Sequence, residues 1–230
     1  MCKESVRYNW AGDIIVRDTL VPNKRAVVGY KDRFIPTDIR EWMKEPPNNK
    51  LSEALSEIPS LPEWKEAGSF NRRAIAIWDY VAKKITYVYD KEAHGLPDFW
   101  MLPEEVLTLE KGDCEDSTFL LCSLLLASGI SPFCVRAVLG IVYDKKGDPL
   151  GGHAWCCYLD ELGKWRLLES TLNAIPATMP LADSLAKEGT EFRYEPMLCF
   201  NQYHLWLIKP STMDISKYLK LAKAKADIRR

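Results

Sequence analysis

A cysteine, a histidine and a glutamate in this sequence have the types and the order that nucleophilic catalysis by a thiol requires. Cys114 is flanked by charge, in the stretch GDCED (112–116), and His153 and Glu169 follow downstream. A thiol attacks as the thiolate, and its pKa falls beside an imidazolium or at the N-terminus of a helix. Such chemistry also needs a base near the thiol and a third group that orients the base.

Cys114 is expected to be the first residue of a helix. Asp113 is a good N-cap, and Asp116 stands three residues later, which is a variant of the capping box. The residues that follow are apolar almost without interruption until Gly129 and Pro132, which stop a helix. A helix that is apolar nearly all round is buried, so the sequence predicts that Cys114 begins a buried helix.

Three β-rich runs follow this helix and are expected to bring His153 to Glu169. The runs cover 133–143, 153–159 and 165–169, and they are separated by turns at 145–149 and 160–163. Strands joined by short turns pair in antiparallel fashion. We therefore expect His153 and Glu169 to face each other across adjacent strands. One ring nitrogen of His153 would contact the carboxylate, and the other would stay within hydrogen-bond reach of Cys114.

The remaining elements indicate an α+β fold. Apolar residues recur at three- and four-residue intervals over 71–85, which predicts an amphipathic helix, and a second helix is expected to begin near Pro103. One or two further strands are expected within 192–208 and a helix over 215–227. Helices followed by an antiparallel sheet are typical of the α+β class, here with the helix of Cys114 packed on the sheet.

The first sixty residues differ from the rest, since they hold several prolines and only short strand candidates, at 13–16 and 25–30. We interpret 1–62 as an N-terminal extension packed on the core. Residues 63–212 are then the catalytic domain, and 213–230 are a C-terminal helix.

Composition excludes several classes of protein. Of the 230 residues 47% are hydrophobic and 11% aromatic, which is material for a large core rather than for a disordered chain. The formal net charge of -1 lacks the basic excess of nucleic-acid binders. No apolar run is long enough for a membrane helix, and the first residues do not resemble a signal peptide. We expect no nucleic-acid or membrane partner.

The cysteines indicate a reducing compartment. There are seven, an odd number, and no two have CxxC spacing. Neither a disulfide scaffold nor a zinc ribbon fits this pattern, so we expect a cytoplasmic protein with free thiols.

Three stretches resemble the motifs of transglutaminase-like cysteine enzymes: GDCEDS (112–117), GGHAW (151–155) and WRLLEST (165–171). The resemblance covers about 70–171 and implies a papain/transglutaminase-like core. It also implies that Cys114 is the nucleophile, His153 the base and Glu169 the acid, and it makes the indole N–H of Trp100 an oxyanion-hole candidate. The family usually has Asp followed by Pro-Thr as its acid, whereas this chain has Glu169 followed by Ser170-Thr171.

The resemblance further implies attack on an amide carbonyl through an acyl-thioester on Cys114. Water as the acceptor gives a cysteine peptidase or amidase acting on a protein or peptide, which we favour. An amine as the acceptor gives a transglutaminase. A non-catalytic protein-binding module with the same fold is a third interpretation.

Three acids surround the thiol, and carboxylates raise the pKa of a neighbouring thiol. We expect Asp113 and Asp116 to cap the backbone and Glu115 to point to solvent, and we expect no cofactor. The alternative is that these acids bind calcium beside the nucleophile, as in some members of the superfamily.

Overall fold

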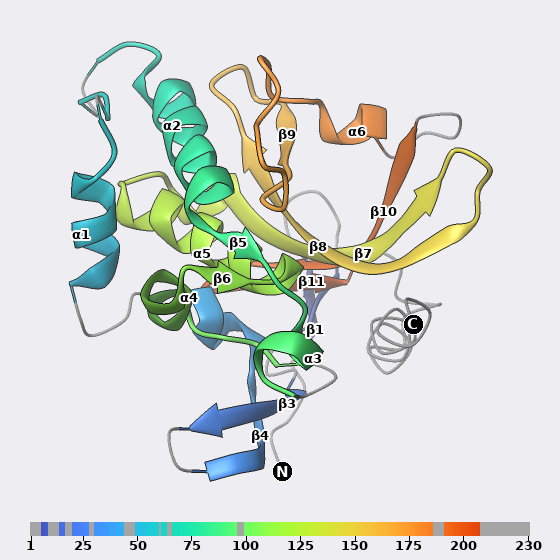
Figure 1. Ribbon diagram of the computed structural model, residues 1–230. Coiled ribbons are helices and arrows are strands. Elements are labelled where there is room, and N and C mark those ends of the chain that lie inside the picture. The colour runs from blue at the N-terminus through green and yellow to red at the C-terminus, as the bar shows by residue number, and fades with distance from the viewer. Residues whose placement is uncertain are drawn as a thin grey trace.

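The computed structural model of the chain describes residues 6–8, 14–16, 20–27, 30–43, 49–59, 61–63, 66–95, 99–185 and 191–207 (Figure 1). The helix expected over 215–227 lies outside these residues. No helix among them is long and apolar enough to cross a membrane.

A seven-stranded antiparallel sheet is the main element of the fold. Its strands, in spatial order, are β1 (Val6–Tyr8), β2 (Ile14–Val16), β11 (Leu205–Leu207), β10 (Phe192–Phe200), β7 (Val135–Asp144), β8 (Pro149–Leu159) and β9 (Trp165–Leu168). The strands β7, β8 and β9 form the predicted meander, with turns close to the predicted places, because the alternation and turn residues that specify it are local.

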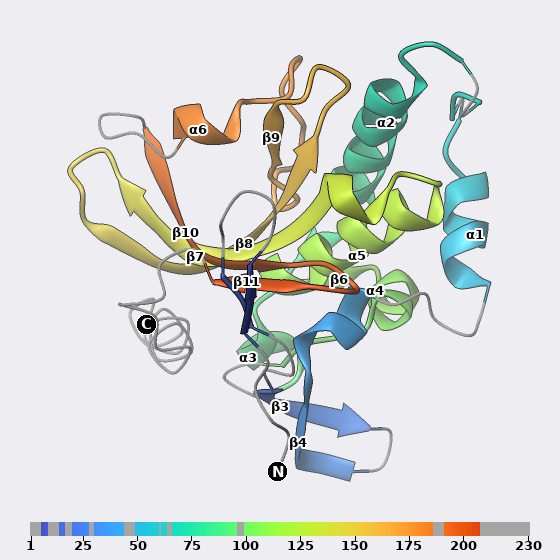
Figure 2. The same ribbon diagram turned by 180° about the vertical axis from the view of Figure 1, so that it is seen from behind.

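The helix α5 (Cys114–Ala127) packs on β8 and β7 and is buried along most of its length. Around it lie α2 (Ser69–Lys84), α4 (Pro103–Leu109), α1 (Lys50–Ser56) and the 3₁₀ turn η1 (Ile39–Met43). Figures 1 and 2 show these helices gathered at one end of the sheet, while β7, β8 and β10 curve away from them. The predicted α+β class, with the helix of Cys114 on an antiparallel sheet, is confirmed.

Each face of the sheet has its own apolar cluster. On β8, Ala154, Cys156 and Tyr158 belong to the large core around α5. The alternate residue Trp155 points to the other face and packs with Val138, Leu167, Cys199 and Trp206. This alternation follows from the two-residue repeat of a strand, and it separates the α5 face from a second, smaller core.

Shorter elements complete the described structure. They are the hairpin β3 (Leu20–Val27) and β4 (Tyr30–Asp38), the parallel pair β5 (Thr86–Tyr87) and β6 (Lys111–Gly112), and α3 (Asp90–Ala93), η2 (Pro132–Cys134) and α6 (Ala182–Leu185). The strand expected over 25–30 is wrong, because β3 ends at Val27 and β4 begins at Tyr30. Gly29 in this run is a turn signal that interrupts the β-prone residues.

Candidate active site

The motif around Cys114 has a structural explanation. The N–H of Asp113 donates to Oδ2 of Asp116 at 3.2 Å, as in a capping box, and Cys114 is the first residue of α5, as predicted. The other oxygen of Asp116 accepts from the N–H of Met101 at 2.8 Å, so this carboxylate ties the preceding loop to the helix. A Cβ on Gly112 would lie 2.6 Å from the Cβ of Asp116, which explains the glycine at this position.

His153 and Glu169 form a close, largely buried pair. Nε2 of His153 lies 2.8 Å from Oε2 of Glu169, so Nε2 is the ring nitrogen that contacts the acid and Nδ1 is the other one. The same Oε2 accepts from the phenol of Tyr194 at 3.1 Å. The other oxygen, Oε1, accepts from the N–H and the hydroxyl of Thr171, at 3.1 and 2.8 Å. The contact between histidine and acid is therefore present, and two further residues hold the acid.

The protonation of Glu169 follows from these contacts. Burial opposes its ionisation, but the charge and hydrogen bond of His153 and the hydrogen bonds of Thr171 outweigh burial and lower its pKa to about 2. An ionised Glu169 accepts a hydrogen bond from Nε2–H of His153, so in the neutral imidazole the proton is on Nε2 and Nδ1 is the acceptor.

The end of β9 is fastened to the first turns of α5. The hydroxyl of Ser170 lies 3.1 Å from the hydroxyls of both Ser117 and Thr118. The indole of Trp78, on α2, donates to the carbonyl oxygen of Glu169 at 2.8 Å. A backbone hydrogen bond from Ala154, the residue after His153, acts on the thiol of Cys114 and by itself lowers its pKa. Cys114, His153 and Glu169 are thus on neighbouring segments.

The thiol of Cys114 is bonded to a carboxylate rather than to the histidine. Its Sγ donates to Oε2 of Glu115 at 3.0 Å, and in the part of the chain that the structure describes its Sγ makes no hydrogen bond to His153. The expectation that Glu115 points to solvent is wrong, because Glu115 is only 5% exposed. Burial, then the charges of Glu115 and Asp113, raise the pKa of Cys114 well above its usual range.

The acids beside the thiol form a compact, buried cluster. Possible ligand atoms of Asp113, Cys114 and Glu115 lie within 4.8 Å of one another, and so do those of Asp90, Asp113 and Asp116. Burial and the neighbouring carboxylates raise the pKa of both Asp113 and Asp116. Oδ1 of Asp113 is buried without a hydrogen-bond partner in the described structure. Apart from the sulfur of Cys114, the possible ligand atoms are all carboxylate oxygens, and with the unpartnered Oδ1 they fit a hard divalent cation such as calcium.

Trp100 has the surroundings of a core aromatic. It is 1% exposed, and its ring packs edge-on against Trp42 and Phe119. Its carbonyl oxygen accepts from the indole of Trp42 at 3.4 Å. The role of Trp100 in an oxyanion hole stays a prediction.

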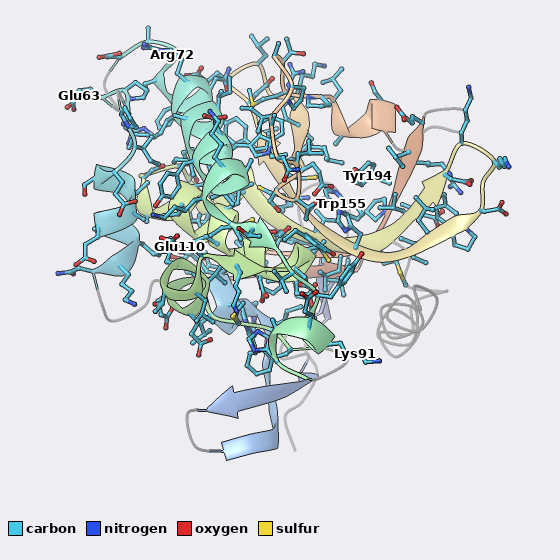
Figure 3. All side chains as sticks on the ribbon, viewed as in Figure 1. Glu63, Arg72, Lys91, Glu110, Trp155 and Tyr194 are labelled. Carbon is cyan, nitrogen blue, oxygen red and sulfur yellow. The ribbon has the colours of Figure 1, made fainter. Side chains whose placement is uncertain are left out.

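Sequence reasoning missed Tyr194, Thr171 and Tyr87. Thr171 stands in the third motif and could have been found there. Tyr194 comes from β10, and Trp155 packs edge-on against it at a ring-centroid distance of 5.3 Å (Figure 3). Burial raises the pKa of the Tyr87 phenol most, and the nearby charges of Cys114, Asp113 and Glu115 raise it further.

Comparison with known proteins finds one family model that matches part of the chain. The family model described as the transglutaminase-like superfamily matches residues 63–170, the segment that holds Cys114, His153 and Glu169. The match covers a little under half of the chain, and this segment is similar to the transglutaminase-like superfamily. The core described above is thus a transglutaminase-like core, as the three motifs predicted, and Tyr194 reaches it from a strand beyond the matched segment.

Solved structures similar to this chain include Legionella pneumophila LapG. It matches with a TM-score of 0.48 and 18% identity over 76% of this chain and 86% of that chain. The calcium-bound form of the same protein matches with the same score and identity over 76% and 87% of the two chains. The search of curated proteins found no match.

Proposed function

We propose that this protein is a transglutaminase-like cysteine peptidase or amidase that acts on a protein or peptide, with Cys114 as nucleophile. The observation that carries the proposal is the His153–Glu169 contact of 2.8 Å at the end of β9, which Ser170 fastens to the first turns of α5. A buried carboxylate that receives four hydrogen bonds holds an imidazole in one orientation. A binding surface alone gives no reason for such an arrangement beside a thiol.

In the proposed acylation step, Nδ1 of His153 takes the proton of the Cys114 thiol. The sulfur attacks the amide carbonyl carbon, a C–S bond forms, and the carbonyl π electrons move to oxygen. The backbone N–H of Cys114, with the indole N–H of Trp100 as the second candidate, would stabilise this oxyanion. When the carbonyl re-forms, the C–N bond breaks and the proton on Nδ1 goes to the leaving amine.

Deacylation repeats the sequence with water. His153 takes a proton from the water as its oxygen attacks the thioester carbon. The C–S bond then breaks to give the carboxylic acid, and the imidazolium of His153 returns its proton to the leaving sulfur of Cys114. Glu169 stays ionised throughout and stabilises the imidazolium. An amine in place of water would give the transglutaminase reaction, which the same residues could perform.

We also propose that a divalent cation, with calcium as the first choice, binds the acids beside the thiol. Asp113 and Glu115 would hold it, with Asp90 and Asp116 close to Asp113, since Oδ1 of Asp113 has no hydrogen-bond partner among the described residues. When bound, the cation would neutralise the carboxylates that keep the thiol protonated. This would reconcile the raised pKa of Cys114 with its role as a nucleophile.

The proposal is tested by incubating the full chain with a proteome-derived peptide library, in calcium and in chelator, and finding new peptide ends by mass spectrometry. We expect cleavage by the wild type and none by Cys114→Ser or His153→Ala. Cys134→Ser, a half-buried thiol away from the site, is the matched control and should cleave as the wild type does. Failure of the wild type to cleave under both conditions, with well-folded protein, would favour the binding module.

A further inference from the structure

A small pocket lies on the face of the sheet opposite α5. Its volume is about 190 Å³, and it is lined mainly by apolar and aromatic groups, among them Trp155, Trp165, Leu167 and Tyr194. Trp155 and Tyr194 also form the wall toward the His153–Glu169 pair, because Tyr194 donates to Glu169 and Trp155 lies 6.3 Å from the ring of His153 (Figure 3). The pocket therefore adjoins the candidate active site, shares Tyr194 with it, and is not lined by Cys114, His153 or Glu169.

One charged side chain, Arg136, lines this pocket. Its guanidinium carbon lies 4.3 Å from the ring centroid of Trp165 and 4.5 Å from that of Trp206, so two indoles stack on it. In the described structure its one hydrogen bond runs from Nη1 to Sγ of Cys199 at 4.0 Å, and sulfur is a weak acceptor. Stacking leaves the N–H edge of a guanidinium available, so Arg136 keeps donors for a ligand.

The other described arginines show how unusual this is. Five of them donate to oxygen: Arg40, Arg72, Arg73, Arg166 and Arg193. Arg193 is the best comparison, since it also stacks on an aromatic ring, that of Tyr143 at 4.0 Å, but pairs with Glu195 at 2.9 Å. Arg136 has no such oxygen among the described residues. Nε1 of Trp206, which stacks on it, is likewise a buried donor without an acceptor.

A ligand for this pocket must supply the acceptor oxygens that Arg136 lacks among the described residues. A planar guanidinium edge recognises a carboxylate by two parallel hydrogen bonds. The aromatic walls favour a flat apolar body. A cavity of about 150 Å³ holds benzene, so 190 Å³ suits a single ring with a short chain.

We propose that this pocket binds a small organic carboxylate with a flat apolar body, that its carboxylate pairs with Arg136, and that its ring lies against Trp155 and Trp165. The proposal does not depend on the reaction at Cys114. It adds a ligand site to the concave side of β7–β10, next to the residues that hold Glu169.

The experiment titrates the full chain with 3-phenylpropanoate and, separately, with the neutral 3-phenylpropanamide, followed by the tryptophan indole N–H resonances. We expect the acid to bind with a Kd of about 1 mM, as for a tight fragment, and the amide about tenfold more weakly. Arg136→Gln should lower the affinity for the acid to that for the amide and leave the affinity for the amide unchanged. Arg136→Lys should recover only part of the difference, because an ammonium is not bidentate.

Arg193→Gln is the matched control, since it removes a stacked arginine from the neighbouring strand, and it should bind the acid as the wild type does. The proposal is overturned if the wild type binds acid and amide equally, or if the acid shows no saturable binding at about twenty times the expected Kd. Wild-type affinity for the acid in folded Arg136→Gln would also overturn it. The wild-type comparison of acid with amide decides the matter even if Arg136→Gln does not fold.

Discussion

The phenol of Tyr194 and the ring of His153 hydrogen-bond to the same carboxylate oxygen of Glu169, at 3.1 and 2.8 Å. Glu169 comes just after β9 and Tyr194 from β10, two strands that are not neighbours in the sheet. The sheet curves enough to bring both side chains to one carboxylate. Tyr194 is therefore a positioning residue for the acid, and it acts on His153 only through Glu169.

Replacing Tyr194 by phenylalanine tests this relationship. Tyr194→Phe removes one donor to the ionised carboxylate and keeps the ring that packs on Trp155, so we expect the pKa of Glu169 to rise by about one unit. The measurement is an NMR titration of the Glu169 carboxyl carbon. Tyr143→Phe, on the adjacent strand β7, should leave the midpoint unchanged. An unchanged midpoint in Tyr194→Phe would show that the phenol contributes nothing to the charge state of Glu169.

Because the pKa of Glu169 is low in the folded protein, the free energy of unfolding is expected to depend on pH in the acid range. Its pKa falls from an ordinary 4.5 to about 2 on folding, so its contribution is complete above the ordinary value and is lost as pH falls toward about 2. A shift of this size corresponds to roughly 3 kcal/mol. Between about pH 5 and pH 2, we expect the free energy of unfolding to drop more for the wild type than for Glu169→Gln, by an amount up to this value.

Denaturant unfolding at several pH values provides the measurement. Glu66→Gln removes an exposed carboxylate that pairs with Arg72, and its acid dependence should match that of the wild type. Parallel curves for the wild type and Glu169→Gln would mean that Glu169 is not ionised with a depressed pKa in the folded protein.

The elements that carry the site were predictable because their signals are local. The N-cap and capping acid of α5, the apolar run after Cys114 and the turns between β7, β8 and β9 all lie within a few residues of what they specify. The pairing of His153 with Glu169 follows from the same short hairpin. Local order thus placed the three proposed catalytic residues on neighbouring segments.

What the sequence could not predict comes from contacts between distant segments. Tyr194 reaches Glu169 from β10, which pairs with β7 and β11 and not with β9, and whose pairing with β7 has a register shift between Pro196 and Leu198. Glu115 lies in the first turn of a helix, where a charged residue is commonly solvated. It is nevertheless buried, with Tyr87 and the other acids close to it, and the β5–β6 pairing sets Tyr87 beside Gly112.

Gly140 is expected to be intolerant of a side chain. It lies opposite His153 in the β7–β8 pair, and a Cβ there would be 2.2 Å from the carbonyl oxygen of Glu195 and 2.5 Å from the ring of Trp155. Gly140→Ala should therefore lower the free energy of unfolding by about 1–3 kcal/mol, measured by denaturant titration. In the double variant Gly140→Ala/Trp155→Phe the clash with the indole ring is removed, but the clash with the carbonyl oxygen of Glu195 remains. We therefore expect the double variant to regain only part of the free energy of unfolding that Gly140→Ala loses. A stability equal to that of the wild type would contradict this packing.

The last prediction concerns the proton on Cys114. The sequence favours a thiol whose pKa is lowered by the helix N-terminus and His153, whereas the structure has a buried thiol that donates to Glu115 and whose pKa is raised. Glu115→Gln removes both the acceptor charge and the repulsion of a thiolate. We therefore expect Cys114 in Glu115→Gln to alkylate about tenfold faster than in the wild type at about pH 8, as a fall of one unit in its pKa would produce.

Iodoacetamide labelling, read for each cysteine by mass spectrometry, measures this rate, with the exposed Glu92→Gln as the matched control. Calcium should accelerate labelling of Cys114 in the wild type and chelator should slow it. The reason is that a cation bound at the acid cluster would neutralise the charge of Glu115, as the substitution to glutamine does. Glu115→Gln should lose most of that calcium response, since it lacks one of the proposed ligands. If Glu115→Gln labels no faster than the wild type at any pH, the carboxylate does not hold the thiol proton. The slow reaction would then come from burial and from the charge of Asp113, which the substitution leaves in place.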